Sequence, residues 1–238
     1  MEITPGLSTA TILWIGFVLG LRHAVEADHL AAVTAIVSEK NNIWTASIVG
    51  GLWGLGHTIS LFVVGALVIF MKVQISESTQ AKLEAVVGGM LILLGVNAIR
   101  KIFTSEKIHV HIHDHDGRPH AHFHAHESEE HSHKAARHHR LSPRSVLIGM
   151  VHGLAGSAAL MLLIVPTIES SSLAMLYIVI FSVGSIGGMM AISFLIGLPF
   201  HFTAARLTSL NKGIRFFAGA FSVCLGLFIV YEKLVVGA

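Results

Sequence analysis

The chain has 238 residues, of which 53% are hydrophobic and only 13% are charged. Soluble domains usually carry about twice that charged fraction, so the composition indicates a membrane protein. The net charge of +2, with basic residues in short loops and no interleaved aromatics, gives no support for nucleic-acid binding. Cys224 is the only cysteine, which excludes an intramolecular disulfide and a cysteine-based zinc site.

Six segments are long and apolar enough to cross a bilayer, because a spanning helix needs about 20 mostly apolar residues. They cover residues 8–37, 43–71, 83–103, 144–166, 171–199 and 213–236. Glu2 and no basic region precede the first segment, so we expect a retained span rather than a cleaved signal peptide. That segment is too long for one simple span and is either a long tilted helix or two half-helices. Pro199 is expected to end the fifth span.

Basic residues gather in alternate connections, which orients the spans. The connections 38–42, 104–143 and 200–212 hold eight of the 16 lysines and arginines and four more lie at their edges, whereas the opposite side has only Lys72, Lys82 and Lys233. By the positive-inside rule these connections are cytoplasmic, and with six spans both termini face outward. The sequence therefore predicts a multi-pass protein of the cytoplasmic membrane, in contact with lipid.

The two halves of the chain share a glycine and histidine pattern. The matches are Gly20-x2-His23 with Gly149-x2-His152 at an offset of 129, Gly56 with Gly187 at 131, and Gly88-x6-Gly95 with Gly219-x6-Gly226 at 131. Three spans per half would place the second half upside down, as in the inverted repeats of secondary transporters. We expect an all-α membrane protein with a first repeat at 1–103, a His-rich disordered cytoplasmic loop at 104–143, and a second repeat at 144–238.

Ionisable residues interrupt the first span at His23, Glu26, Asp28 and His29. Such residues are costly inside a membrane and mark functional sites. Imidazole and carboxylate groups together suit nickel, cobalt, copper or zinc. At about 100° per residue, Asp28 falls on nearly the opposite helix face from His23 and His29. A regular helix therefore cannot bring the three to one ion, so the segment is broken there or the ion is shared with another span.

Three further polar residues lie within apolar spans. His57 follows Gly54-Leu55-Gly56 and is a candidate ligand, although a lone buried histidine is often only a satisfied core residue. His152 is the repeat counterpart of His23 but has no accompanying carboxylate. Asn97 is a candidate for the surroundings of the site, and an interhelical hydrogen bond explains it equally well.

Twelve of the seventeen histidines lie between residues 109 and 139. A tract of this kind binds metal loosely at many sites, and the plain alternative is a solvated linker. We interpret it as a cytoplasmic metal buffer that is dispensable for transport itself. The buffer candidates are His109, His111, His113, His115, His120, His122, His124, His126, His131 and His133.

The stretch from Leu19 to Ala32, with the pattern H-x4-D-H, resembles the motif of the nickel/cobalt transporter (NiCoT) family. Leu55-Gly56-His57-Thr58 is similar to the second motif of that family. The resemblance implies secondary transport of Ni²⁺ or Co²⁺ as substrate, with His23, Asp28 and His29 essential and His57 contributing. It implies no prosthetic group, and Glu26 is our candidate for a proton-coupled or supporting carboxylate.

The chain departs from the family pattern in having about six spans where typical members have eight. The acidic motif of the second half is replaced by a segment that starts at His152, which resembles the short branch associated with urease or hydrogenase metal supply. The direction of transport is open, because compact nickel/cobalt exporters also have six spans and a His-rich loop. The Asp28-His29 pair favours uptake.

No motif indicates an enzyme. The chain lacks a G-x4-G-K-[ST] nucleotide-binding run, so transport would depend on an ion gradient or a partner. His126-Glu127 is followed by His131, and this spacing does not fit a zinc protease. Two alternatives to uptake stay open: nickel/cobalt efflux, and a non-transporting accessory for metalloenzyme maturation. Partners would be maturation proteins of urease or hydrogenase, or further copies of the chain.

Overall fold

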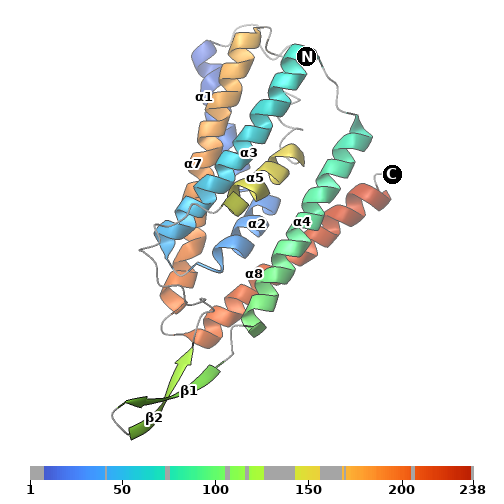
Figure 1. Ribbon diagram of the computed structural model, residues 1–238. Coiled ribbons are helices and arrows are strands. Elements are labelled where there is room, and N and C mark those ends of the chain that lie inside the picture. Colours follow the sequence, from blue (N-terminus) through green and yellow to red (C-terminus); the bar gives the residue numbers. More distant parts are fainter. Residues whose placement is uncertain are drawn as a thin grey trace.

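The computed structural model describes residues 8–40, 42–72, 76–104, 108–115, 118–125, 143–155, 168, 170–204 and 207–236. Helices dominate the described part of the chain (Figure 1). They are α1 (Thr9–His23), α2 (Ala27–Val37), α3 (Ile43–Met71), α4 (Glu77–Thr104), α5 (Pro143–Ala155), α7 (Ser171–Ala204) and α8 (Thr208–Tyr231), followed by the π-helical turn η2 (Glu232–Val236). Two strands, β1 (Ile108–His115) and β2 (Arg118–Ala125), lie between α4 and α5.

Local chemistry sets several helix ends. The Asn42 side chain accepts hydrogen bonds from the backbone N–H groups of Trp44 and Thr45, which caps the first turn of α3. Lys72, with φ of 52°, ends the same helix in a left-handed conformation. Pro199 does not end the fifth span as predicted, because α7 continues to Ala204 with this proline inside it. The proline lies close to the helix end, where few backbone hydrogen bonds follow it.

Four helices are long and apolar enough to cross a membrane: α3, α4, α7, and α8 with η2. The pair α1 and α2 gives a fifth span if it crosses as one unit, bent by 53°. The remaining predicted span, 144–166, is described only as far as Ala155, and its second half lies outside the described residues. The protein is thus an all-α membrane protein with four or five spans in its described part.

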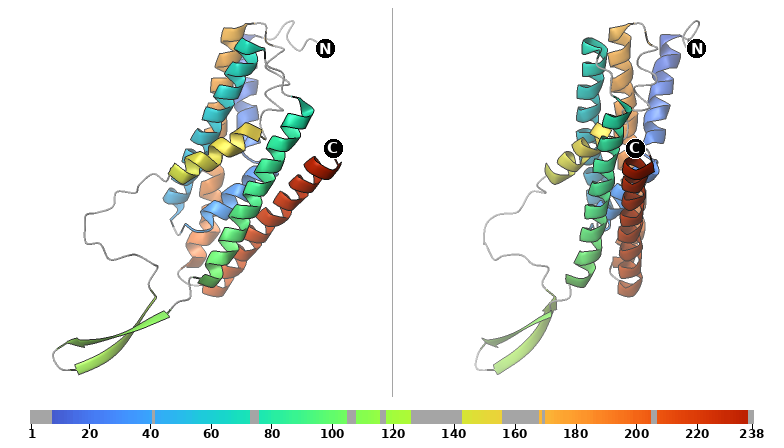
Figure 2. Two further views of the ribbon diagram at one scale, coloured as in Figure 1. Left: turned by 45° about the vertical axis from the view of Figure 1, so that its right-hand side comes forward. Right: turned by 90° about the vertical axis from the view of Figure 1, so that its right-hand side faces the viewer.

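The helices form two groups (Figures 1 and 2). Helices α1, α3 and α7 run side by side, and α5 crosses beside α3. Helices α4 and α8 pack against each other, with α2 between the two groups. The lower ends of α2, α4 and α7 lie at the end of the molecule where the β hairpin projects, and α8 ends toward the opposite side. The ends of α2, α4 and α7 border the three connections that the charge pattern predicts to be cytoplasmic.

Helix contacts recur in pairs, as a twofold repeat requires. Gly56 of α3 packs against the backbone of Val146 in α5, and Gly184 of α7 packs against the backbone of Phe17 in α1. The packing therefore makes Gly184 the counterpart of Gly56, whereas the sequence comparison had paired Gly56 with Gly187. That pairing was wrong because the connections differ in length between the halves, so one offset does not hold throughout.

The α4 and α8 pair shows the same symmetry at the predicted offset. A Cβ atom on Gly88 would lie 2.8 Å from the carbonyl oxygen of Gly226, and one on Gly219 would lie 2.9 Å from that of Gly95. These glycines let the two backbones touch, which is how helices associate in lipid. The contacts are reciprocal, as a repeat would give, and the inverted arrangement of the two halves stays a prediction.

The described part of the histidine-rich loop is an antiparallel hairpin. Its register pairs His109 with His124, His111 with His122, and His113 with His120. The loop was predicted to be disordered, and this hairpin is the regular structure found in its described residues. His126, His131 and His133 lie outside the described residues.

Candidate metal centre

The first span is broken at the histidine motif. Helix α1 ends at His23 and α2 begins at Ala27, with Glu26 in an extended conformation at the N-cap. The backbone N–H groups of Val25 and Glu26 donate to the carbonyl groups of Arg22 and His23, at 3.0 and 3.1 Å, which tightens the end of α1 into a turn. The segment is therefore broken, which is one of the two alternatives that the helical angles leave open. No proline or glycine occurs at residues 24–26, so tertiary contacts hold the bend.

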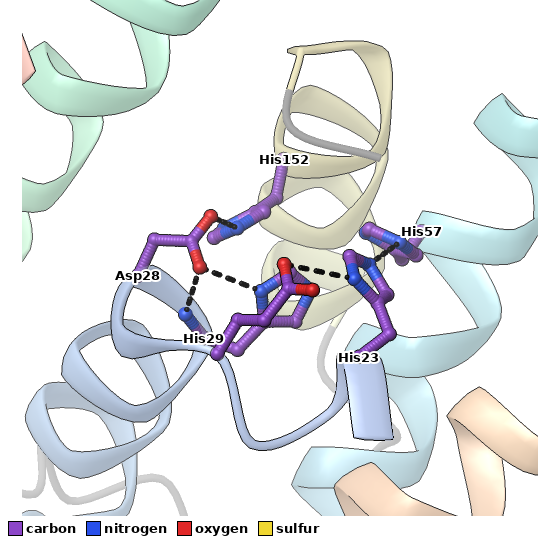
Figure 3. A network of polar contacts seen from close by, with 6 residues as sticks. His23, Asp28, His29, His57 and His152 are labelled. Atoms are coloured by element: carbon purple, nitrogen blue, oxygen red, sulfur yellow. Dashed lines mark hydrogen bonds and ion pairs between the residues drawn. The ribbon is translucent and has the colours of Figure 1, made fainter. Parts of the chain in front are cut away.

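His23, His29 and His57 form one group of three imidazoles (Figure 3). One ring nitrogen from each lies within 4.8 Å of those of the other two. The Nε2 atoms of His23 and His57 are 3.1 Å apart, and the rings of His23 and His29 meet edge to face with centroids 4.3 Å apart. All three side chains are buried. The bend thus brings two residues of the first span to a histidine of α3.

Asp28, His29 and His152 form the second group. Asp28 Oδ1 lies 3.0 Å from His29 Nδ1 and accepts the His29 backbone N–H at 2.9 Å, while Oδ2 lies 3.0 Å from His152 Nε2. Figure 3 shows the Asp28 carboxylate between the two rings. His29 is common to both groups, so the five side chains form one continuous cluster. Carboxylate and imidazole donors together make a set suited to a divalent transition metal.

Glycines bring α3 and α5 close enough to complete the cluster. A Cβ atom on Gly149 would clash with the backbone carbonyl of Trp53 and would lie 3.0 Å from the His57 backbone nitrogen. Gly153 contacts the His57 backbone in the same way. Because of this contact, His57 and His152 lie side by side, with ring centroids 5.9 Å apart.

Aromatic rings close the cluster off from its surroundings. The Trp53 ring lies 5.2 Å from the rings of both His29 and His152, and Phe181 lies 5.6 Å from His23. Neither residue is among those predicted from the sequence. Trp53 could have been found, because it lies four residues before His57 on the same helix face.

Two buried imidazole nitrogens of the cluster have no hydrogen-bond partner within the described part of the chain. They are Nε2 of His29 and Nδ1 of His152. Buried polar atoms are nearly always satisfied, so each such atom calls for a partner such as an ion or a water molecule. A metal ion bound within the cluster would supply one for His29.

The structure thus brings together all five residues that the sequence proposed as metal ligands. Glu26 lies beside them, with Oε2 at 3.0 Å from His23 Nδ1. Asn97 is placed elsewhere: its amide donates at 3.3 Å to Oε1 of Glu39, which lies two residues after the end of α2, so a structural hydrogen bond between segments accounts for it. Glu39 also pairs with Lys101 at 2.6 Å.

A comparison with family models shows to which protein family the chain belongs. Residues 9–230 match the NicO model, described as a high-affinity nickel-transport protein. The chain belongs to the NicO family. The H-x4-D-H segment and nearly all of the described membrane region therefore lie within a nickel-transport domain, and the resemblance to nickel/cobalt transporters is confirmed.

Individual relatives add to this assignment. The chain is 36% identical over 222 residues to the urease accessory protein UreH of Bacillus sp. strain TB-90, which covers 93% of the chain and 91% of that protein. It is 33% identical over 91 residues to a high-affinity nickel transport protein of Cupriavidus necator, 37% of the chain and 26% of that protein. A candidate nickel/cobalt efflux system of Methanocaldococcus jannaschii is 32% identical over 87 residues, 35% of the chain and 41% of that protein. No solved structure gives a significant match.

Proposed function

We propose that this NicO protein is a secondary transporter that carries Ni²⁺, or Co²⁺, into the cytoplasm. His23, Asp28, His29, His57 and His152 are the proposed ligands of the transported ion. The observation that carries the proposal is that these five side chains, which come from three separate segments, form one cluster in which all four histidines are buried and ring nitrogens of His29 and His152 have no partner among the described residues. Membership of a nickel-transport family supports the choice of metal.

The spacing of the donors fits a divalent ion. Metal–nitrogen bonds of about 2.1 Å place two ligands about 3.0 Å apart at right angles and about 3.4 Å apart at a tetrahedral angle. The His23 and His57 nitrogens are 3.1 Å apart, and both Asp28 contacts are 3.0 Å. These distances are those of neighbouring ligands in square-planar or octahedral coordination, which Ni²⁺ adopts. Without a metal, they are also ordinary hydrogen-bond distances.

The two groups of ligands suggest two positions for the ion. The group with Asp28 supplies a negative charge, which offsets part of the cost of taking a dication out of water. The group with His23 and His57 supplies nitrogen donors. His29 belongs to both, so an ion can pass from one group to the other without losing all its ligands. Glu26, next to His23, is the carboxylate that we propose takes part in proton coupling.

Uptake of radiolabelled nickel by cells that express the protein tests this proposal. We expect the wild type to accumulate nickel, and His23→Ala and His29→Ala to abolish accumulation. His201→Ala is the matched control, because His201 is exposed near the end of α7. If His23→Ala and His29→Ala cells accumulate nickel like the wild type, the site is wrongly assigned.

The direction of transport is tested by the sign of the same measurement. If cellular nickel falls on expression while nickel tolerance rises, the protein is an exporter, and the likeness to the candidate efflux system would be the better guide. A second candidate function follows from the similarity to a urease accessory protein over 93% of the chain. A non-transporting accessory would show no flux at all, and its role would depend on the histidine-rich loop.

A further inference from the structure

A second ionic arrangement lies next to the cluster. A cavity of about 270 Å³ separates the start of α2 from α4 and α8. Its polar lining consists of Asp28, Glu84 and Lys233. Apolar side chains, including Leu225 and Ile229, form much of the rest. We call this cavity the vestibule.

The vestibule leads to the carboxylate that holds two of the buried histidines. The Asp28 side chain is 21% exposed, whereas the His29 and His152 side chains with which it bonds are fully buried. Asp28 is therefore the member of the second ligand group that borders open space. Any ion that approaches through the vestibule meets Asp28 before it meets an imidazole.

An ion pair lies across this route. Glu84 Oε2 is 2.8 Å from Lys233 Nζ, and Glu84 Oε1 accepts a hydrogen bond from Gln80 at 3.0 Å. A second carboxylate, that of Glu232, lies 3.7 Å from the same ammonium group. Lys233 thus has two acidic partners, and a small movement of its long side chain can exchange one for the other.

We propose that the vestibule is the outer access route to the metal centre, with Glu84 as a transient cation-binding carboxylate and Lys233 as its internal competitor. This inference rests on the proposed function. An arriving divalent cation displaces the Lys233 ammonium from Glu84, and the ammonium moves to Glu232. The ion then passes from Glu84 to Asp28 and His152. Because Lys233 neutralises Glu84 when no ion is present, Glu84 is not left as an unpaired buried charge.

The position of the pair along the helices agrees with an outer route. Glu84 lies seven residues after the start of α4, or about 10 Å along the helix axis. Lys233 lies just beyond the end of α8. Both helix ends are on the side opposite the hairpin, which the charge pattern assigns to the outside (Figure 1).

Transport kinetics distinguish a competing cation from a purely structural ion pair. We expect Glu84→Gln to raise the KM for nickel about tenfold, and Lys233→Gln to lower it several-fold, because the competitor is gone. The double variant should resemble Glu84→Gln. Glu77→Gln is the control, an exposed carboxylate on the first turn of α4. Equal increases of KM in both single variants would mean that the pair is structural and would overturn the inference.

Thiol labelling tests the route without any transport. Cys224, the only cysteine, is first replaced by serine, and Ile229→Cys or Phe228→Cys is then introduced. Ile229 lines the vestibule, whereas its neighbour Phe228 is 60% exposed on the outer surface of α8, toward lipid. A membrane-impermeant thiol reagent added outside intact cells should modify Ile229→Cys and leave Phe228→Cys intact. An unmodified Ile229→Cys would refute the outer route.

These outcomes separate the two proposals. If the proposed function is wrong, the wild type takes up no metal, and labelling of Ile229→Cys is the result that decides whether the vestibule opens outward. If only the vestibule is wrong, the wild type transports nickel normally, Glu84→Gln leaves KM unchanged, and Ile229→Cys is not labelled.

Discussion

Replacement of Asp28 by asparagine removes one negative charge from the cluster and leaves its shape nearly unchanged. The wild-type carboxylate accepts the His29 backbone N–H at 2.9 Å and contacts ring nitrogens of His29 and His152 at 3.0 Å. Asparagine keeps one acceptor oxygen and turns the other contact into an N–H donor, so one histidine contact must rearrange. The main loss is the attraction between a carboxylate and a dication.

The size of this effect follows from measured losses of buried charge partners. Removal of one partner of a buried, hydrogen-bonded charge pair costs about 2–5 kcal/mol, which is about 30-fold to about 4,000-fold in affinity. We therefore expect nickel binding to purified Asp28→Asn protein in detergent, measured by titration calorimetry, to weaken by at least about 30-fold. Glu77→Gln should bind like the wild type. An Asp28→Asn protein that is folded and binds nickel within threefold of the wild type would refute the assignment of Asp28 as a ligand.

Three further predictions concern packing, the loop and an ion pair outside the cluster. Gly149→Ala should lower stability by about 1–3 kcal/mol and impair uptake, because its Cβ meets the backbone of α3; Gly187→Ala, which meets no described atom within 4 Å, should be neutral in a thermal unfolding assay. Deletion of residues 109–139 should leave the maximal nickel flux intact and change only its regulation or apparent affinity, and complete loss of flux would contradict the buffer role. Glu39→Gln should cost less than about 1 kcal/mol of unfolding free energy, because its partner Lys101 is half exposed.

The sequence was a good guide wherever a local pattern carried the information. The spacing of His23, Asp28 and His29 is incompatible with a straight helix, and the structure breaks the helix at residues 24–26. Ionisable residues in apolar spans are few, so His57 and His152 were recognisable as candidates from the cost of burying them. Their meeting point was not recognisable, because it depends on the contact between Gly149 and α3.

Other features depend on tertiary structure that no short pattern records. Glu84 lies near the start of the third predicted span, and Lys233 lies about 150 residues later, near the C-terminus. Only the packing of α4 against α8 makes them partners. The assignment of Gly56 to Gly187 failed because sequence offsets drift with loop length, whereas packing identifies Gly184. Asn97 lies in a span, as the buried histidines do, but its partner Glu39 lies in the turn after α2.

Net metal flux into proteoliposomes tests the central claim most directly, because purified protein and lipid exclude every partner. With nickel outside and the protein's outer face outward, we expect nickel to accumulate inside, cobalt to compete with it, and His29→Ala to show no flux. Absence of nickel flux in the wild type, or equal flux in wild type and His29→Ala, would contradict the account.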